Sequence, residues 1–252
     1  MRWGILDIKV LTIFPEMFES PLNASILYKA RQKGLLNISL INFRDYAQNK
    51  HNSVDDYPFG GGAGMVLKPE PIITALEANI TMGDPDQEII LLSPQGKVYK
   101  QEHAKLLAKK SKLVFICGHY EGFDERIRAF ATEECSIGDY VLTGGELPAL
   151  VMIDSIARLI PGVIKESQSF EEDSFYQGLI EYPHYTRPRD FRNIEVPEVL
   201  LSGNHEHIKQ WRYKESLRRT LIRRPDLLST YNLSEEDRNL IREIEIEEQI
   251  DG

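Results

Sequence analysis

The chain has 252 residues, a length that fits either one large domain or two modest ones. Its residues are 42% apolar and 27% charged, which is ordinary for a globular protein and excludes disordered, collagen-like and coiled-coil chains. The 30 basic residues against 39 acidic ones give a net charge of −9, which argues against a protein that coats nucleic acid without specificity.

Strand-like and helix-like segments alternate through the first part of the chain. Short β-rich runs predict buried strands, and longer segments with apolar residues at helical spacing predict helices. In chain order these are a strand at residues 8–14, a helix at 17–31 that Gly34 ends, a strand at 38–43, a helix at 69–79, a strand at 88–92, a helix at 101–109, a strand at 113–117 and a helix at 146–160. This order predicts an α/β fold with a mostly parallel sheet over residues 1–160.

The composition changes near Pro161. Residues 165–177 are polar and acidic with few apolar anchors, so we expect residues 161–177 to form an interdomain linker or mobile loop. Beyond this segment the β pattern stops. We therefore expect a small, mainly helical C-terminal domain over residues 178–252.

Two helices of opposite charge are predicted in this C-terminal domain. Helical spacing covers residues 206–221 and 234–249, and Ser234 with the acid three residues later gives an N-cap pattern. Residues 205–224 hold seven Lys or Arg against two Glu, whereas residues 234–251 hold eight acids against two bases. We expect the acidic helix to be solvated.

The basic helix has two interpretations. It is either a solvated helix face or a surface that contacts phosphates, where each Lys or Arg would neutralise backbone charge and release counterions. Trp211 and Tyr213 lie between the basic residues. The candidate RNA contacts on this helix are Lys209, Arg212, Arg218 and Arg219.

Membrane, disulfide and metal sites are not predicted. The longest apolar runs, such as residues 10–14 and 149–153, are far shorter than the about 20 residues that a membrane helix needs. Only two cysteines occur, Cys117 and Cys135, and neither belongs to a CxxC pair. The histidines show no metal-ligand spacing such as HExxH. We expect a reducing, cytoplasmic setting and no bound metal.

A glycine-rich run at residues 60–65 matches neither template for phosphate binding. No GKS or GKT follows it, and it does not connect a strand directly to a helix, as a dinucleotide-binding loop would. It stays an unassigned loop that would allow close approach of the backbone to a ligand.

Three further segments follow predicted strands, at the edge where α/β proteins bind ligands. They lie at residues 92–96, 117–122 and 136–148, and each places glycines beside groups that can form hydrogen bonds. Any one of them alone is best explained as an ordinary tight turn. All three in this order are much more specific.

These loops and their neighbours resemble the bacterial tRNA (guanine-N1)-methyltransferase family, the TrmD family within the knotted methyltransferases. The resemblance runs nearly from end to end. The segments that carry it are residues 14–18, 60–65, 118–122, 137–148, 160–163, 172–175, 183–188 and 200–205.

The resemblance implies an α/β sheet whose chain threads a deep trefoil knot, a rare exception to un-knotted connections. It implies S-adenosylmethionine as the methyl donor and a homodimer whose subunits share the active site. The implied substrate is tRNA, at the guanosine 3′ of the anticodon (position 37). The residues that it assigns to the methyl donor are Ser93, Pro94, Gly118, Tyr120, Glu121, Gly122, Ile137, Gly138, Asp139, Tyr140, Val141, Leu142, Gly144, Gly145 and Pro148.

Methylation of guanine N1 needs two protein groups. N1 carries a proton at neutral pH, so a base must remove it, and negative charge then accumulates at O6, where a cation helps. The resemblance assigns the base to Asp173 and the O6 contact to Arg158, which Asp154 would orient through a salt bridge. From the residues alone, a solvated acidic run explains Asp173 better than a catalytic role does, and Arg158 fits a role at the helix dipole.

Four further residues are candidate RNA contacts: Ser174, His184, Arg187 and Asn204. Two alternatives stay open. One is a knotted methyltransferase that acts on another RNA or on a ribose hydroxyl, and the other is a non-catalytic adenosylmethionine-binding RNA module. Neither alternative needs a base together with a cation. The presence of both Asp173 and Arg158 therefore favours the enzyme that methylates guanine in tRNA. We expect any effect of magnesium to act through RNA or through a few carboxylates.

Overall fold

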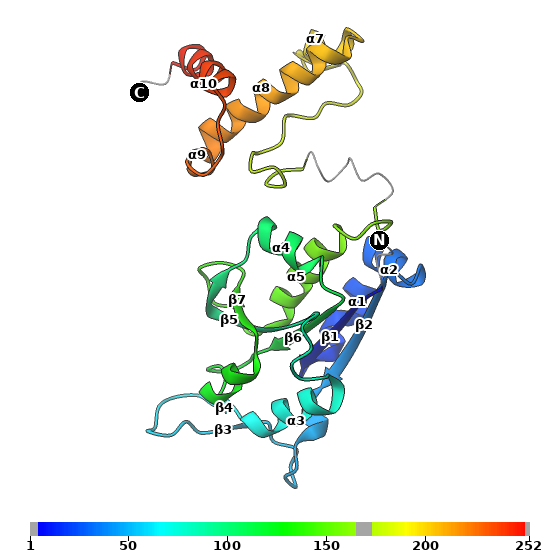
Figure 1. Ribbon diagram of the computed structural model, residues 1–252, viewed down its shortest axis with the longest axis vertical. Helices are drawn as coiled ribbons and strands as arrows, with labels where there is room; N and C mark the ends of the chain where they lie inside the picture. The colour runs from blue at the N-terminus through cyan, green and yellow to red at the C-terminus, as the bar shows by residue number, and fades with distance from the viewer. Residues whose placement is uncertain (1–4, 165–172, 250–252) are drawn as a thin grey trace. The chain divides into compact units, whose positions relative to one another are not determined.

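The computed structural model describes residues 5–164 and 173–249, and the chain forms two compact units, Met1–Ser167 and Gln168–Gly252 (Figure 1). Each unit has a hydrophobic core of its own. Of the predicted linker at residues 161–177, residues 165–172 lie outside the described part of the chain.

Five parallel strands form the sheet of the first unit. In spatial order they are β2 (Leu36–Asn42), β1 (Leu6–Thr12), β6 (Lys112–Cys117), β5 (Gln87–Val98) and β7 (Glu133–Ser136). The predicted α/β class with a parallel sheet is confirmed, as are the four predicted strands, although β5 continues six residues past its predicted end. The apolar patterns miss β7, because it has four residues of which two are glutamates.

Helices cover both faces of the sheet, so the first unit has three layers (Figure 1). Ile8 and Val10 point to one face, and Leu11 points to the other. The helices on the first face include α2 (Ser25–Gln32), α4 (Gln101–Leu107) and α5 (Glu146–Ala157). Those on the second face are α3 (Pro69–Asn79) and the 3-10 helices η2 (Phe43–Tyr46) and η3 (Glu125–Phe130). A sheet buried on both faces explains the nearly continuous apolar runs of its strands.

The prediction of one continuous helix at residues 17–31 is wrong. The chain forms three pieces there, namely η1 (Pro15–Phe18), α1 (Glu19–Leu22) and α2. Ala24 between α1 and α2 is extended, with φ −126° and ψ 157°. The guanidinium of Arg31 donates to the carbonyl oxygen of Leu22 at 3.0 Å. At the end of α1 the carbonyl of Leu22 has no partner within the helix, and the bond from Arg31 supplies one. The bond therefore stabilises the break between α1 and α2.

The remaining helices of the first unit follow the prediction closely. α3 begins and ends at the predicted residues, whereas α4 ends two residues early and α5 ends three residues early. Two short strands, β3 (Asp55–Asp56) and β4 (Val66–Leu67), pair antiparallel, and the glycine-rich run lies in the loop that joins them. This loop reaches out from the sheet (Figure 1).

The second unit is mainly helical. Its elements are β8 (Asp190–Phe191), β9 (Ile194–Glu195), α7 (Glu198–Leu201), α8 (His205–Arg223), α9 (Pro225–Leu228) and α10 (Glu235–Glu247). Leu179, Leu217 and Ile244 form its buried core. The predicted cap at Ser234 is confirmed as a reciprocal capping box with Asp237. In the described part of both units, no helix is long and apolar enough to cross a membrane.

Candidate active site

An irregular part of β5 and the loops that follow β6 and β7 meet and enclose a cleft of about 310 Å³. The N–H of Gly145 donates to the carbonyl oxygen of Gly118 at 2.9 Å, and His119 forms a β-bridge with Gly144. The loop after β6 and the loop after β7 are therefore held together through their backbones. This edge is where open α/β sheets bind ligands.

The structure brings together fourteen of the fifteen residues that the resemblance assigns to the methyl donor. Asp139 is the exception, because it is exposed and does not line the cleft. The residues that do line it are Ser93, Pro94, Gly118, Tyr120, Glu121, Gly122, Ile137, Gly138, Tyr140, Val141, Leu142, Gly144, Gly145 and Pro148. Their role in binding a ligand stays a prediction.

Two glycines of the cleft leave no room for a side chain. A Cβ on Gly145 would lie 2.7 Å from Cα of Cys117, and one on Gly118 would lie 2.7 Å from Cε2 of Phe123. Both distances are shorter than Cβ atoms show in proteins. The close approach of these loops therefore requires glycine at both positions.

The loop predicted after residue 92 is an irregular continuation of β5. Its register with β7 shifts between Leu92 and Lys97, as in a β-bulge. Within the shift, the N–H of Gln95 donates to Oγ of Ser93 at 3.1 Å. This local turn presents Ser93 and Pro94 to the cleft.

A buried carboxylate lies beneath the cleft, and the sequence analysis missed it. Glu146 is fully buried at the start of α5. One of its oxygens accepts from Oγ1 of Thr12 at 2.6 Å, and the other lies 2.8 Å from Nε2 of the cleft residue His119. Burial, followed by the charge of Glu146, raises the pKa of the Cys117 thiol well above its ordinary value. The network therefore anchors His119, and Cys117 stays a neutral thiol.

A second group of cleft residues also escaped prediction. Arg128 lines the cleft, lies 2.8 Å from a carboxylate oxygen of Glu125 and is ion-paired with Glu134. It also donates to the side-chain oxygen of Gln95 at 3.0 Å. These contacts tie η3 to the bulge of β5 and to β7. No spacing rule connects these positions.

The glycine-rich run reaches the cleft through Glu121. The N–H of Glu121 donates to the carbonyl oxygen of Met65 at 3.0 Å, and a Cβ on Gly64 would lie 2.4 Å from Cγ of Glu121. The run therefore lies beside the cleft, as close backbone approach requires. Tyr57 and Phe59, which precede it, are exposed.

The two predicted catalytic residues belong to different units. Arg158, which is partly buried, ends α5 in the first unit, and its backbone N–H donates to the carbonyl oxygen of Asp154 at 3.2 Å. Asp173, also partly buried, belongs to the second unit, where its carbonyl oxygen accepts from the N–H of Tyr176 at 3.2 Å. The pairing of Asp173 with Arg158 and the salt bridge with Asp154 stay predictions.

Three predicted RNA contacts line one groove of the second unit, with a volume of about 480 Å³. They are His184, Arg187 and Arg212. The guanidinium of Arg212 lies 4.7 Å from the centre of the Tyr182 ring, and the ring of His184 lies 4.7 Å from the same ring. Tyr185 also lines the groove and is exposed. Aromatic rings beside guanidinium groups are a surface on which unpaired nucleobases stack.

The other predicted RNA contacts are spread over the second unit. Oγ of Ser174 accepts from the N–H of Glu181 at 3.1 Å. The side-chain oxygen of Asn204 accepts from two N–H groups in the first turn of α8, so this residue is the N-cap of the helix. Lys209 is exposed and Arg219 is partly buried. Their contacts with RNA stay predictions.

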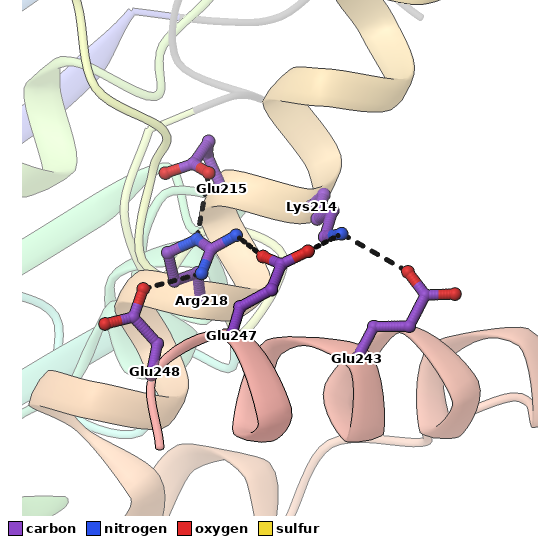
Figure 2. Close-up of polar contacts among 6 residues, drawn as sticks. All are labelled: Lys214, Glu215, Arg218, Glu243, Glu247 and Glu248. Carbon is purple, nitrogen blue, oxygen red and sulfur yellow. Dashed lines mark hydrogen bonds and ion pairs between the residues drawn. The ribbon is translucent and has the colours of Figure 1, made fainter. Parts of the chain in front are cut away.

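The acidic helix α10 is not simply solvated, which corrects the expectation (Figure 2). Arg218 contacts the carboxylates of Glu215 at 2.9 Å, Glu248 at 2.6 Å and Glu247. Lys214 contacts Glu247 at 2.9 Å and Glu243 at 3.2 Å. The side chain of Arg218 is only 17% exposed. The structure therefore places Arg218 in the contact between α8 and α10, and its contact with RNA stays a prediction.

This ion-pair network predicts a dependence of stability on pH. Hydrogen bonds from Arg218 and then Lys214 lower the pKa of Glu247 from 4.5 to about 2. A carboxyl group whose folded pKa is lowered stabilises the fold above its unfolded pKa, and this contribution is lost as the pH falls through the folded pKa. We therefore expect the stability difference between the native protein and Glu247→Gln to shrink between about pH 4.5 and pH 2 in thermal unfolding. A difference that stays constant over this range would contradict the assignment.

Comparisons with known proteins match the chain over nearly its whole length. The family model described as tRNA (Guanine-1)-methyltransferase TrmD matches residues 6–230. The tRNA (guanine-N(1)-)-methyltransferase of Geobacillus kaustophilus is 58% identical, over 97% of this chain and 100% of the relative. The proteins with the same name from Bacillus subtilis and Dictyoglomus turgidum are 56% and 53% identical over 96% of this chain, and over 100% and 98% of their own lengths. This chain belongs to the tRNA (guanine-1)-methyltransferase TrmD family.

Proposed function

We propose that this protein transfers a methyl group from S-adenosylmethionine to N1 of the guanosine at position 37 of tRNA, 3′ of the anticodon. Membership of the family supports guanine N1 of tRNA as the target. The observation that carries the proposal is the single cleft in which three loops from the strand ends meet. With tRNA as substrate, the cytoplasm is the compartment that we propose.

The cleft suits a small cationic nucleoside derivative. Its lining combines glycines with apolar side chains such as Ile137 and Leu142. The carboxylates of Glu121 and Glu125 also line it; that of Glu125 is paired with Arg128, and that of Glu121 would attract a positive charge. When bound, S-adenosylmethionine supplies an activated methyl group and a good leaving group. The protein then has to hold the acceptor nitrogen in line with that group. Any effect of magnesium would act through these carboxylates or through the RNA.

Removal of the N1 proton is the step that the protein itself must assist. We propose that the carboxylate of Asp173 accepts this proton and that the guanidinium of Arg158 stabilises the negative charge that develops at O6. Membership of the family supports the assignment, because both residues lie within the matched range and fit the pair that the resemblance implies. Asp173 lies near the start of the second unit, and a carboxylate is a group that can accept the N1 proton.

The connections around the cleft support a trefoil knot. The chain between β6 and β7 has to pass β5, which lies between them in the sheet. The loop after β7 then returns to the loop after β6, where Gly145 bonds Gly118. A knot requires that a segment pass through a loop formed by an earlier crossover, and we propose that the chain after β7 does so.

Exposed apolar side chains support a homodimer in which the cleft is shared. Val141 is 84% exposed at the rim of the cleft, and Leu147 and Val151 lie one turn apart on the outer side of α5. Apolar residues gathered in this way are typical of a surface that another protein covers. We propose that a second copy covers them and contributes to the site.

The groove of the second unit gives a specific prediction for RNA binding. Arg212→Ala should weaken tRNA binding and reduce the slope of log affinity against log salt by about 1, because one phosphate contact is lost. Arg242→Ala is the matched control, since Arg242 is an exposed arginine of the same unit that does not line the groove. It should leave the salt slope unchanged. Equal salt slopes for Arg212→Ala and the native protein would contradict the proposal that the groove binds RNA.

Two tRNA transcripts that differ only at position 37 test the proposed function. The protein is incubated with labelled S-adenosylmethionine and either the guanosine or the adenosine transcript. We expect methyl transfer to the guanosine transcript alone. Equal transfer to both would favour a methyltransferase with a ribose or other target, and binding without transfer would favour a non-catalytic RNA module.

A further inference from the structure

A group of three potential metal ligands lies on the sheet, outside the catalytic assignments made above. His103 comes from α4, and Glu133 and Cys135 come from β7, where alternate residues point to the same face. Nε2 of His103 lies 2.9 Å from an oxygen of Glu133, and its Nδ1 lies 3.9 Å from Sγ of Cys135. One ligand atom from each residue fits within 4.8 Å of the other two.

The surroundings of this group hold it in place. The ring of Tyr99 packs 5.5 Å from the ring of His103, and its hydroxyl lies 2.8 Å from Oγ of Ser155 on α5. Cys135 is buried, whereas the side chains of His103 and Glu133 are 17% and 25% exposed. Packing therefore fixes the positions of these side chains. Their partial exposure leaves a path by which a metal ion can enter from solvent.

We propose that His103, Glu133 and Cys135 bind a divalent transition-metal ion of the zinc class, with water in the fourth position. The donor set decides the class of ion. One sulfur, one imidazole nitrogen and one carboxylate oxygen suit Zn²⁺ or Co²⁺, whereas Mg²⁺ and Ca²⁺ take oxygen ligands. Binding requires the thiolate, so uptake of the ion releases the proton of Cys135, and the affinity rises with pH.

The site is linked to the cleft through the chain. Cys135 lines the cleft as well, and the loop of residues 136–148 follows it directly. A bound ion would clamp β7 to α4 and so restrain the start of that loop. The inference does not depend on the proposed methyl transfer, because it concerns binding of a metal ion alone.

Titration of the full-length protein with Co²⁺, followed by absorption, tests the site. We expect binding of one ion with a thiolate-to-cobalt charge-transfer band, and displacement of the Co²⁺ by Zn²⁺. Cys135→Ser should abolish the band, and His103→Gln should weaken binding at least about tenfold. Cys117→Ala is the matched control, because this buried cysteine lies outside the group and should leave the band unchanged.

Circular dichroism of each variant shows whether it has folded, and His103→Gln decides the test if Cys135→Ser does not fold. The proposal is contradicted if the native protein shows no charge-transfer band. It is equally contradicted if folded Cys135→Ser keeps the band, or if folded His103→Gln binds Co²⁺ as tightly as the native protein.

Discussion

Asp173→Ala should lower kcat for methyl transfer by about 10²–10⁴-fold, the usual contribution of a general base. The loss arises because the N1 proton no longer has an acceptor when the methyl group is transferred. Asp173→Asn should be nearly as slow, since an amide cannot take up the proton. Affinity for S-adenosylmethionine should stay unchanged in both variants, because the cleft lies in the first unit and Asp173 in the second.

Single-turnover rates measure the loss in the chemical step, and equilibrium binding measures the affinity for S-adenosylmethionine, so together they separate a loss of catalysis from a loss of binding. Glu195→Gln is the matched control, because Glu195 is an exposed acid of the same unit. It should keep the native rate. A fall in affinity for S-adenosylmethionine that accounts for the whole loss in Asp173→Ala would contradict the role of a base.

Glu146→Ala should lower the free energy of unfolding by about 3–5 kcal/mol, the range found when one partner of a buried pair is removed. Glu146 is fully buried, and its two oxygens contact Thr12 and His119. The substitution removes the acceptor of the Thr12 hydroxyl and the partner of Nε2 of His119, and it opens a cavity at the start of α5. Because His119 lines the cleft, affinity for S-adenosylmethionine should fall as well.

Denaturant unfolding at neutral pH measures this effect. Thr12→Val removes one of the two contacts and should cost less than Glu146→Ala. Glu77→Ala, at an exposed glutamate of α3, should change stability by no more than about 0.5 kcal/mol. An unfolding free energy for Glu146→Ala equal to that of Glu77→Ala would show that the buried network does not stabilise the fold.

The fold could be predicted where a long segment carries apolar residues at regular spacing without interruption. α3 was predicted to the residue, because Pro69 marks its first position and its apolar residues follow the helical period. The strands buried on both faces were found for the same reason. β7 was missed because it is short and acidic, and the break at Ala24 was missed because a distant arginine stabilises it.

The cleft could be predicted in outline, because its loops follow strands and carry glycines. The contacts that hold it could not. Glu146 meets Thr12 across 134 positions of the sequence, and Arg128 meets Gln95 across 33, so no local spacing reveals either pair. The same holds for Arg218, whose partners Glu247 and Glu248 are about thirty residues away along the chain.

Analysis of the nucleosides of a guanosine-37 tRNA transcript after reaction tests the central claim most directly. The transcript is incubated with the protein and isotope-labelled S-adenosylmethionine, digested and examined by mass spectrometry. The account predicts that the label is found in N1-methylguanosine derived from position 37. Label on a ribose, on another base or on no nucleoside at all would contradict it.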